Sequence, residues 1–150
     1  MPSIWVNLTD ADRKTIAEKI PSLAKKMEHK KIKVSSAKGK GMSFQRRVCE
    51  MISELIDIPY TKDDTSLISP RISGCNGTDI ILRGEAHKKF PFACECKASE
   101  SLSLVSAIVQ AKANITDEQG YIIFHKRRAL LEPIVIMDFS AFCKLWLQRL

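Results

Sequence analysis

The chain has 150 residues, is 45% hydrophobic and carries a formal net charge of +7. This length supports one domain with a substantial core, and the ordinary apolar content excludes a fibre or a wholly disordered chain. The longest apolar stretches, such as Tyr121–Phe124 and Ile134–Met137, are too short to span a bilayer, so we expect no membrane partner.

The cysteine and histidine content favours a reducing location. Five cysteines are an odd number, they form no repeated Cys-x-x-Cys pattern, and only three histidines accompany them. We therefore expect neither a disulfide framework nor a structural zinc site. The N-terminal region has no long apolar segment, so the sequence predicts a cytoplasmic protein without a signal peptide.

Positive charge is concentrated in the first third of the chain. Residues 1–47 contain twelve bases against four acids, a local net charge of +8, whereas residues 48–150 carry −1. This asymmetry favours a polyanionic partner, most often nucleic acid. A solvated, lysine-rich surface helix would give the same pattern.

The N-terminal region is expected to form an appendage. Residues 9–30 have apolar side chains at helical spacing, and Pro21 predicts two short helices instead of one rod. The small, polar, glycine-bearing segment Ser35–Gly41 predicts a linker. We thus expect a basic, mostly helical arm over residues 1–37 and a second domain over residues 38–150.

The second domain has the pattern of an α/β protein. An apolar stripe predicts a helix that Ser43 caps and Pro59 closes. The remaining segments are an irregular stretch at 60–72, strands at 78–82, 90–97, 121–124 and 134–137, a connection at 84–89, and helices at 103–114 and 139–150. This order indicates a mixed central sheet flanked by helices.

An acidic pair is expected where two of these strands meet. Side chains alternate along a strand, so Glu95 and Lys97 share the face opposite Cys94 and Cys96. Burying charges beside a core is costly unless they are paired or bind an ion. Asp79 lies on the preceding strand, and pairing of the two strands would bring it to Glu95.

Asp79 and Glu95 together predict a site for a hard cation. Oxygen ligands without histidine or thiolate favour Mg²⁺, with Mn²⁺ as a substitute, over zinc. Such an ion polarises a phosphodiester and lowers the pKa of a bound water, and Lys97 could orient that water or stabilise transition-state charge. An exposed glutamate–lysine pair on a strand edge is the simpler alternative.

Short motifs of a known family occur in order over residues 38–138. They are Lys40-Gly41-x-x-Phe44-Gln45-Arg46, Arg71-x-Ser73-Gly74, Gly-Thr-Asp79-Ile, Phe90-Pro-Phe-x-x-Glu95-Cys-Lys97 and Ala107-Ile-x-Gln110-Ala-x-Ala-Asn114. This series resembles the PD-(D/E)XK nuclease superfamily, and within it the Holliday-junction-resolvase-like and small phage-encoded endonucleases.

The resemblance implies a fold, a reaction and a setting. It implies a restriction-endonuclease-like core and metal-dependent hydrolysis of DNA phosphodiesters, with Asp79 and Glu95 as metal ligands and Lys97 as the catalytic lysine. The setting would be the cytoplasm of a bacterial cell or a phage-infected host.

The first helix departs from the family at Gln45, where relatives usually have glutamate. Its amide can still accept a metal-bound water, but the site loses one charge. On a helical wheel Gln45 lies at the border of the apolar stripe, whereas Glu50 lies nearly opposite that stripe. We therefore predict that Gln45 is the helix's catalytic contribution and that Glu50 faces solvent.

DNA contacts are assigned to basic and small polar side chains. These are Lys38, Lys40, Arg46, Arg71, Ser73, Lys126, Arg127 and Arg128. Phosphate contacts from such groups position a protein on DNA. Ser73 fits a turn beside Gly74 equally well, and residues 126–128 fit a solvated hairpin turn equally well.

The functional expectation is a Mg²⁺-dependent DNA endonuclease, resolvase-like in its selectivity for branched DNA. Cutting both strands favours a homodimer or a higher symmetric oligomer. The alternatives are a sequence-specific homing or restriction-type endonuclease acting on duplex DNA, and a DNA-binding protein with a decayed nuclease site. Only Gln45 favours the last.

Overall fold

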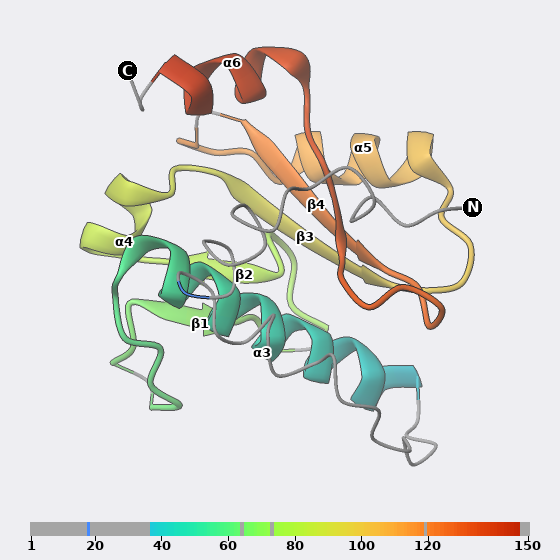
Figure 1. Cartoon of the computed structure of the whole chain (residues 1–150), viewed down its shortest axis with the longest axis horizontal. Helices are drawn as coiled ribbons and strands as arrows, with labels where there is room; N and C mark the ends of the chain where they lie inside the picture. The colour runs from blue at the N-terminus through green and yellow to red at the C-terminus, as the bar shows by residue number, and fades with distance from the viewer. Residues whose placement is uncertain (1–17, 19–36, 64, 73, 119, 148–150) are drawn as a thin grey trace.

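A five-stranded sheet runs through the centre of the computed structural model, which describes residues 18, 37–63, 65–72, 74–118 and 120–147 (Figure 1). The strands are β1 (Ile68–Pro70), β2 (Ile80–Leu82), β3 (Ala93–Ala98), β4 (Tyr121–Lys126) and β5 (Ile134–Ile136), and the helices are α3 (Ala37–Ile56), α4 (Gly84–Lys89), α5 (Leu104–Ala113) and α6 (Phe139–Leu147). The predicted arm of residues 1–37 lies almost entirely outside the described residues.

The sheet is mixed, and its strands follow one another in chain order from β1 to β5. β3 and β4 are parallel, whereas the other three pairings are antiparallel. A parallel pair needs a crossover, and α5 provides it between β3 and β4. This arrangement confirms the predicted mixed sheet flanked by helices.

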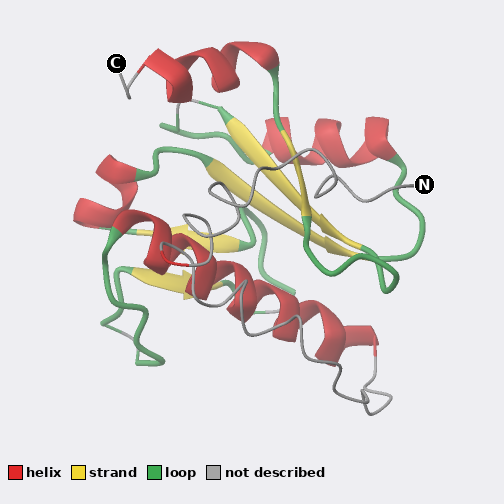
Figure 2. Cartoon of the chain, in the orientation of Figure 1, coloured by secondary structure: helices red, strands yellow, loops and turns green. Residues whose placement is uncertain are grey.

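Helices cover both faces of the sheet, as Figure 2 shows. On one face, Phe92 and Cys94 pack with the buried side of α3, including Val48 and Ile52. On the other face, a second cluster consists of Ala93, Tyr121 and Ile123 from the strands and Ala107 and Ala111 from α5. The alternation predicted for residues 90–97 is therefore confirmed. None of the described helices is long and apolar enough to cross a membrane.

The predicted linker Ser35–Gly41 is wrong from Ala37 onward, because α3 begins there. Its apolar stripe starts at Phe44, and packing of that stripe extends the helix backward over two glycines despite their low propensity. The helix ends before Pro59: Asp57 takes the left-handed conformation (φ 54°), and the Ile58 N–H donates to the Ser53 carbonyl at 3.2 Å.

Two further short elements were missed by sequence reasoning. β1 lies inside the stretch expected to be irregular, and it exists because Ile68, fully buried, pairs opposite Leu82 of β2. The expected connection at 84–89 is helix α4. Glu85 in its first turn and the basic residues in its last turn suit the helix dipole, and Ala86 is buried.

Phe92→Ala should lower the free energy of unfolding by about 3–5 kcal/mol, because the side chain is only 1% exposed and its loss leaves a cavity. Phe92 also meets Phe90 edge-on, with ring centroids 5.5 Å apart. Urea unfolding measures the change. Val105→Ala, at a position 74% exposed on α5, is the control and should change stability by less than about 0.5 kcal/mol. Equal effects would contradict this description of the core.

Candidate functional site

Asp79 and Glu95 meet where β2 begins beside β3. The Asp79 N–H donates to the Cys94 carbonyl at 2.8 Å, and Ile80 pairs opposite Cys94. The carboxyl groups of Asp79 and Glu95 lie within hydrogen-bonding reach of each other. The carboxylate of Asp79 is held by the Cys96 N–H, which donates to Oδ2 at 2.7 Å.

Glu95 is a buried carboxylate with polar neighbours on each oxygen. Its side chain is 3% exposed, and the Lys97 ammonium donates to Oε1 at 2.7 Å. The Asn114 amide donates to Oε2 at 3.4 Å. Burial raises the pKa of Glu95, the Lys97 hydrogen bond opposes that rise, and the negative charge of Asp79 adds to it. Lys97 thus pairs with one of two neighbouring carboxylates, an arrangement that favours binding of further positive charge.

Gln110 of α5 and Asn114, just after that helix, contact Lys97 and Glu95. The Lys97 ammonium also donates to the Gln110 side-chain oxygen at 2.8 Å. Asn114 follows α5 and donates to the Gly77 carbonyl at 3.1 Å, in addition to its contact with Glu95. Sequence reasoning assigned no role to Asn114. Its spacing of four residues from Gln110, which places both on one helix face, was the available signal.

A pocket of about 200 Å³ opens next to Asp79. It is lined by Gly41, Met42, Gln45, Arg71, Ile72, Gly74, Cys75 and Asp79. Among the described residues, the buried Oε1 of Gln45 has no hydrogen-bond partner, so this acceptor is available to a ligand. Glu50 is exposed and pairs with Arg47 at 3.4 Å. The helix is therefore oriented as predicted, with Gln45 toward the pocket and Glu50 away from it.

Arg71 organises the loop that forms one wall of this pocket. Its Nε donates to the Thr78 carbonyl at 2.6 Å, and its backbone N–H donates to the Asp79 carbonyl at 2.8 Å. A Cβ at Gly77 would lie 3.0 Å from the guanidinium, and Gly77 has φ 110°, so glycine is needed there. Arg71 thus positions Asp79 as well as lining the pocket. Ser73 lies outside the described residues.

The other predicted DNA contacts are not among the residues that line the pocket. Lys38 and Lys40 are in the first turn of α3, and Lys40 and Arg46 are exposed. Lys126 is the last residue of β4, directly beyond His125, which pairs with Lys97, and residues 127 and 128 follow the strand. Arg127 and Arg128 are exposed there, and the Arg128 N–H donates to Glu100 at 2.9 Å.

The two cysteines of β3 are free thiols, Cys94 buried and Cys96 partly buried. Burial raises the pKa of the Cys94 and Cys96 thiols well above the usual range, so both stay protonated. The donor set at the β2–β3 junction is therefore made of oxygen atoms.

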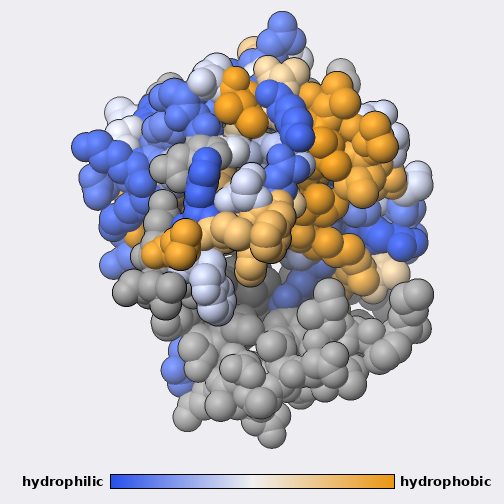
Figure 3. Space-filling view, turned by 90° about the horizontal axis from the view of Figure 1, so that it is seen from above, coloured by the Kyte–Doolittle hydropathy of each residue, from blue (hydrophilic) through white to orange (hydrophobic). Residues whose placement is uncertain are grey.

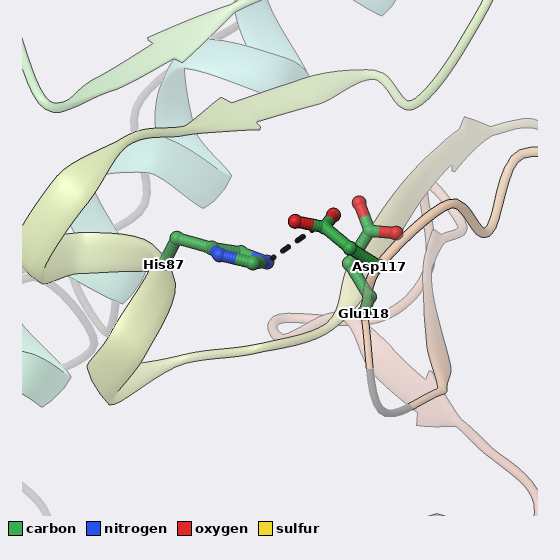
Figure 4. Close-up of side chains that lie close together, drawn as sticks. All are labelled: His87, Asp117 and Glu118. Carbon is green, nitrogen blue, oxygen red and sulfur yellow. Dashed lines mark ion pairs between the residues drawn. The ribbon is translucent and has the colours of Figure 1, made fainter.

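A second polar cluster includes one of the three histidines. His87 Nε2 lies 3.8 Å from Asp117 Oδ1, with Glu118 beside them (Figure 4). Asp117 is 78% exposed, and Glu118 already accepts hydrogen bonds from Thr116 at 2.7 and 3.1 Å. A surface ion pair, formed when His87 is protonated, accounts for these contacts.

No protein-family model, curated protein or solved structure matches this chain. The molecule is a mixed α/β protein whose five-stranded sheet is flanked by helices.

Proposed function

We propose that this chain is a Mg²⁺-dependent DNA endonuclease with a restriction-endonuclease-like core. The observation that carries the proposal is the convergence of Asp79 and Glu95 from neighbouring strands, with Lys97 bonded to Glu95. The motifs that resemble PD-(D/E)XK nucleases fall at this place. In an ion pair that serves only the fold, a second carboxylate beside a buried one is unfavourable. Repulsion between the two negative charges adds to the cost of burial.

The residues at the site suit a hard divalent cation. Asp79 and Glu95 would hold Mg²⁺ or Mn²⁺, and Gln45, whose side-chain oxygen is unpartnered, lines the pocket beside Asp79. Its neutral amide suits contact through a water. When bound, the ion supplies Lewis-acid polarisation of a phosphodiester and lowers the pKa of a coordinated water.

The chain's own residues would orient the reactants. Lys97 presents an ammonium group next to the carboxylates, where it can hydrogen-bond the attacking water or stabilise charge on phosphate oxygens. Gln110 fixes the direction of that ammonium, and Asn114 links Glu95 to the Gly77 loop. The basic residues around the site would hold phosphates on either side of the scissile bond.

The substrate preference is testable with one set of DNA molecules. A four-way junction, a duplex of one arm's sequence and a single strand are incubated with the full chain and Mg²⁺, with EDTA as the control. We expect the junction to be cut faster than the duplex. Preferred cutting of a duplex at defined sequences would favour the homing or restriction-type alternative, and binding without cleavage in Mg²⁺ or Mn²⁺ would favour the decayed nuclease site.

Gln45→Ala should lower cleavage about 10- to 100-fold, because it removes the acceptor that borders the metal pocket without altering either carboxylate. Glu50→Ala is the matched control on the solvent side of the same helix and should leave the rate within about twofold. Gln45→Glu should tighten Mg²⁺ binding, measured by calorimetry, since it adds a charge. Loss of activity in Glu50→Ala, with Gln45→Ala unaffected, would contradict the assignment.

A further inference from the structure

Two further regions of the molecule differ in their chemistry. Figure 3 views the molecule from the side of α6 and α5 and shows apolar residues gathered there, and α6 carries the exposed rings Phe139, Phe142 and Trp146. Groups that can bind a metal gather instead between α4 and the connection from α5 to β4, where an imidazole meets two carboxylates (Figure 4). These groups are not among the residues that line the pocket beside Asp79.

Three candidate ligand atoms converge in this cluster, one each from His87, Asp117 and Glu118. They lie within 4.8 Å of one another. Figure 4 shows the imidazole of His87 pointing toward the two acids. The 3.8 Å between His87 Nε2 and Asp117 Oδ1 is too long for a hydrogen bond. An ion bound at about 2.1 Å to each of two ligand atoms fits between atoms up to about 4.2 Å apart. Small side-chain rotations would therefore bring all three atoms to coordinating distance.

The imidazole of His87 distinguishes this cluster from an ordinary pair of surface acids. Its Nε2 atom is buried and has no hydrogen-bond partner among the described residues. A buried polar atom without a partner is uncommon in a folded protein and indicates a missing ligand. When protonated, His87 pairs with Asp117. When neutral, with its proton on Nδ1, it presents the lone pair of Nε2 to a metal.

Thr116 arranges the two carboxylates beside the imidazole. Its N–H donates to Glu118 Oε2 at 2.7 Å, and its hydroxyl lies 3.1 Å from both Glu118 Oε2 and Asp117 Oδ1. A carboxylate accepts at both oxygens, so these contacts leave capacity for an ion. Neighbouring carboxylates repel each other, and a cation between them removes that repulsion.

We propose that His87, Asp117 and Glu118 form a second metal site, which binds Zn²⁺ through one nitrogen and two oxygens and leaves a fourth position for water. Imidazole together with carboxylates suits Zn²⁺ in four-coordinate geometry, whereas Mg²⁺ prefers oxygen ligands alone. Bound Zn²⁺ would tie α4 to the connection that begins at Asn114, the residue that contacts Glu95. This proposal does not depend on nuclease activity.

The test is Zn²⁺ binding by the untagged full chain, measured by isothermal titration calorimetry with excess Mg²⁺ present to occupy the hard-cation site. We expect one Zn²⁺ per chain, with imidazole and oxygen but no sulfur in its X-ray absorption spectrum. His87→Gln and Asp117→Asn should each weaken binding at least about 100-fold, since loss of an outer-shell partner alone costs up to about that much. Asp117 is 78% exposed, so its variant keeps the test decisive if circular dichroism finds His87→Gln unfolded.

Three variants serve as controls and should bind Zn²⁺ as wild type does. Glu85→Gln changes an exposed acid on α4, Cys75→Ser removes an exposed thiol, and Glu95→Gln alters the proposed nuclease site. Absence of Zn²⁺ binding by wild type would overturn the proposal, as would binding that survives the substitutions at His87 and Asp117. Loss of binding in Cys75→Ser or Glu95→Gln would place the ion elsewhere and would also overturn it.

Discussion

Glu95→Gln and Asp79→Asn should each reduce Mg²⁺-dependent DNA cleavage at least about 1000-fold, because each removes several kcal/mol of metal-dependent stabilisation. DNA affinity should change little, since neither carboxylate belongs to the basic surface. Cleavage of the four-way junction and filter binding to it measure the two effects. Glu85→Gln, an exposed acid on α4, is the control and should cut normally.

Measurements of thermal stability distinguish a metal-binding role of Glu95 from a structural role. Glutamine keeps the size of the Glu95 side chain and an oxygen that can accept from Lys97, so Glu95→Gln should remain folded in EDTA, where its melting temperature gives the metal-free baseline. Wild type should gain melting temperature on addition of Mg²⁺, whereas Glu95→Gln should not. A variant that retains near wild-type cleavage, or the full Mg²⁺-induced gain in melting temperature, would show that Glu95 is not a metal ligand.

Lys97→Ala should lower cleavage about 100- to 1000-fold, the range found when a single charge-stabilising donor is removed from an active site. It should also change how stability depends on pH. Lys97 opposes the rise in the Glu95 pKa, so its removal should raise that pKa further.

The direction of the pH effect follows from the raised pKa of Glu95 in the folded protein. A carboxyl whose pKa is raised by folding contributes stability below its unfolded pKa, and this contribution is lost as pH rises through the folded value. In EDTA, the free energy of unfolding of Lys97→Ala should therefore fall more steeply than that of wild type as pH rises above the ordinary glutamate pKa. Lys88→Ala, an exposed base on α4, is the control. Parallel curves for Lys97→Ala and wild type would contradict the ion pair as the main partner of Glu95.

Periodicity in the sequence determined the parts of the site that depend on a single element. The two-residue repeat of a strand placed Glu95 and Lys97 on one face and Cys94 on the other, and the structure has that arrangement. The helical repeat placed Gln45 at the edge of the apolar stripe and Glu50 in solvent, which the structure also has. These outcomes need only local geometry.

Only the tertiary structure decided the contacts between elements. β1 is three residues long and is stabilised by pairing with β2, so no local repeat could predict it. Arg71 reaches the Thr78 carbonyl, and Asn114 reaches both Gly77 and Glu95, across 7, 37 and 19 residues of sequence. The exposure of the α6 rings likewise depends on which side of the helix the sheet covers. Such contacts form when segments that are distant in sequence pack together. A pattern read over a short stretch of residues does not predict which distant segments meet.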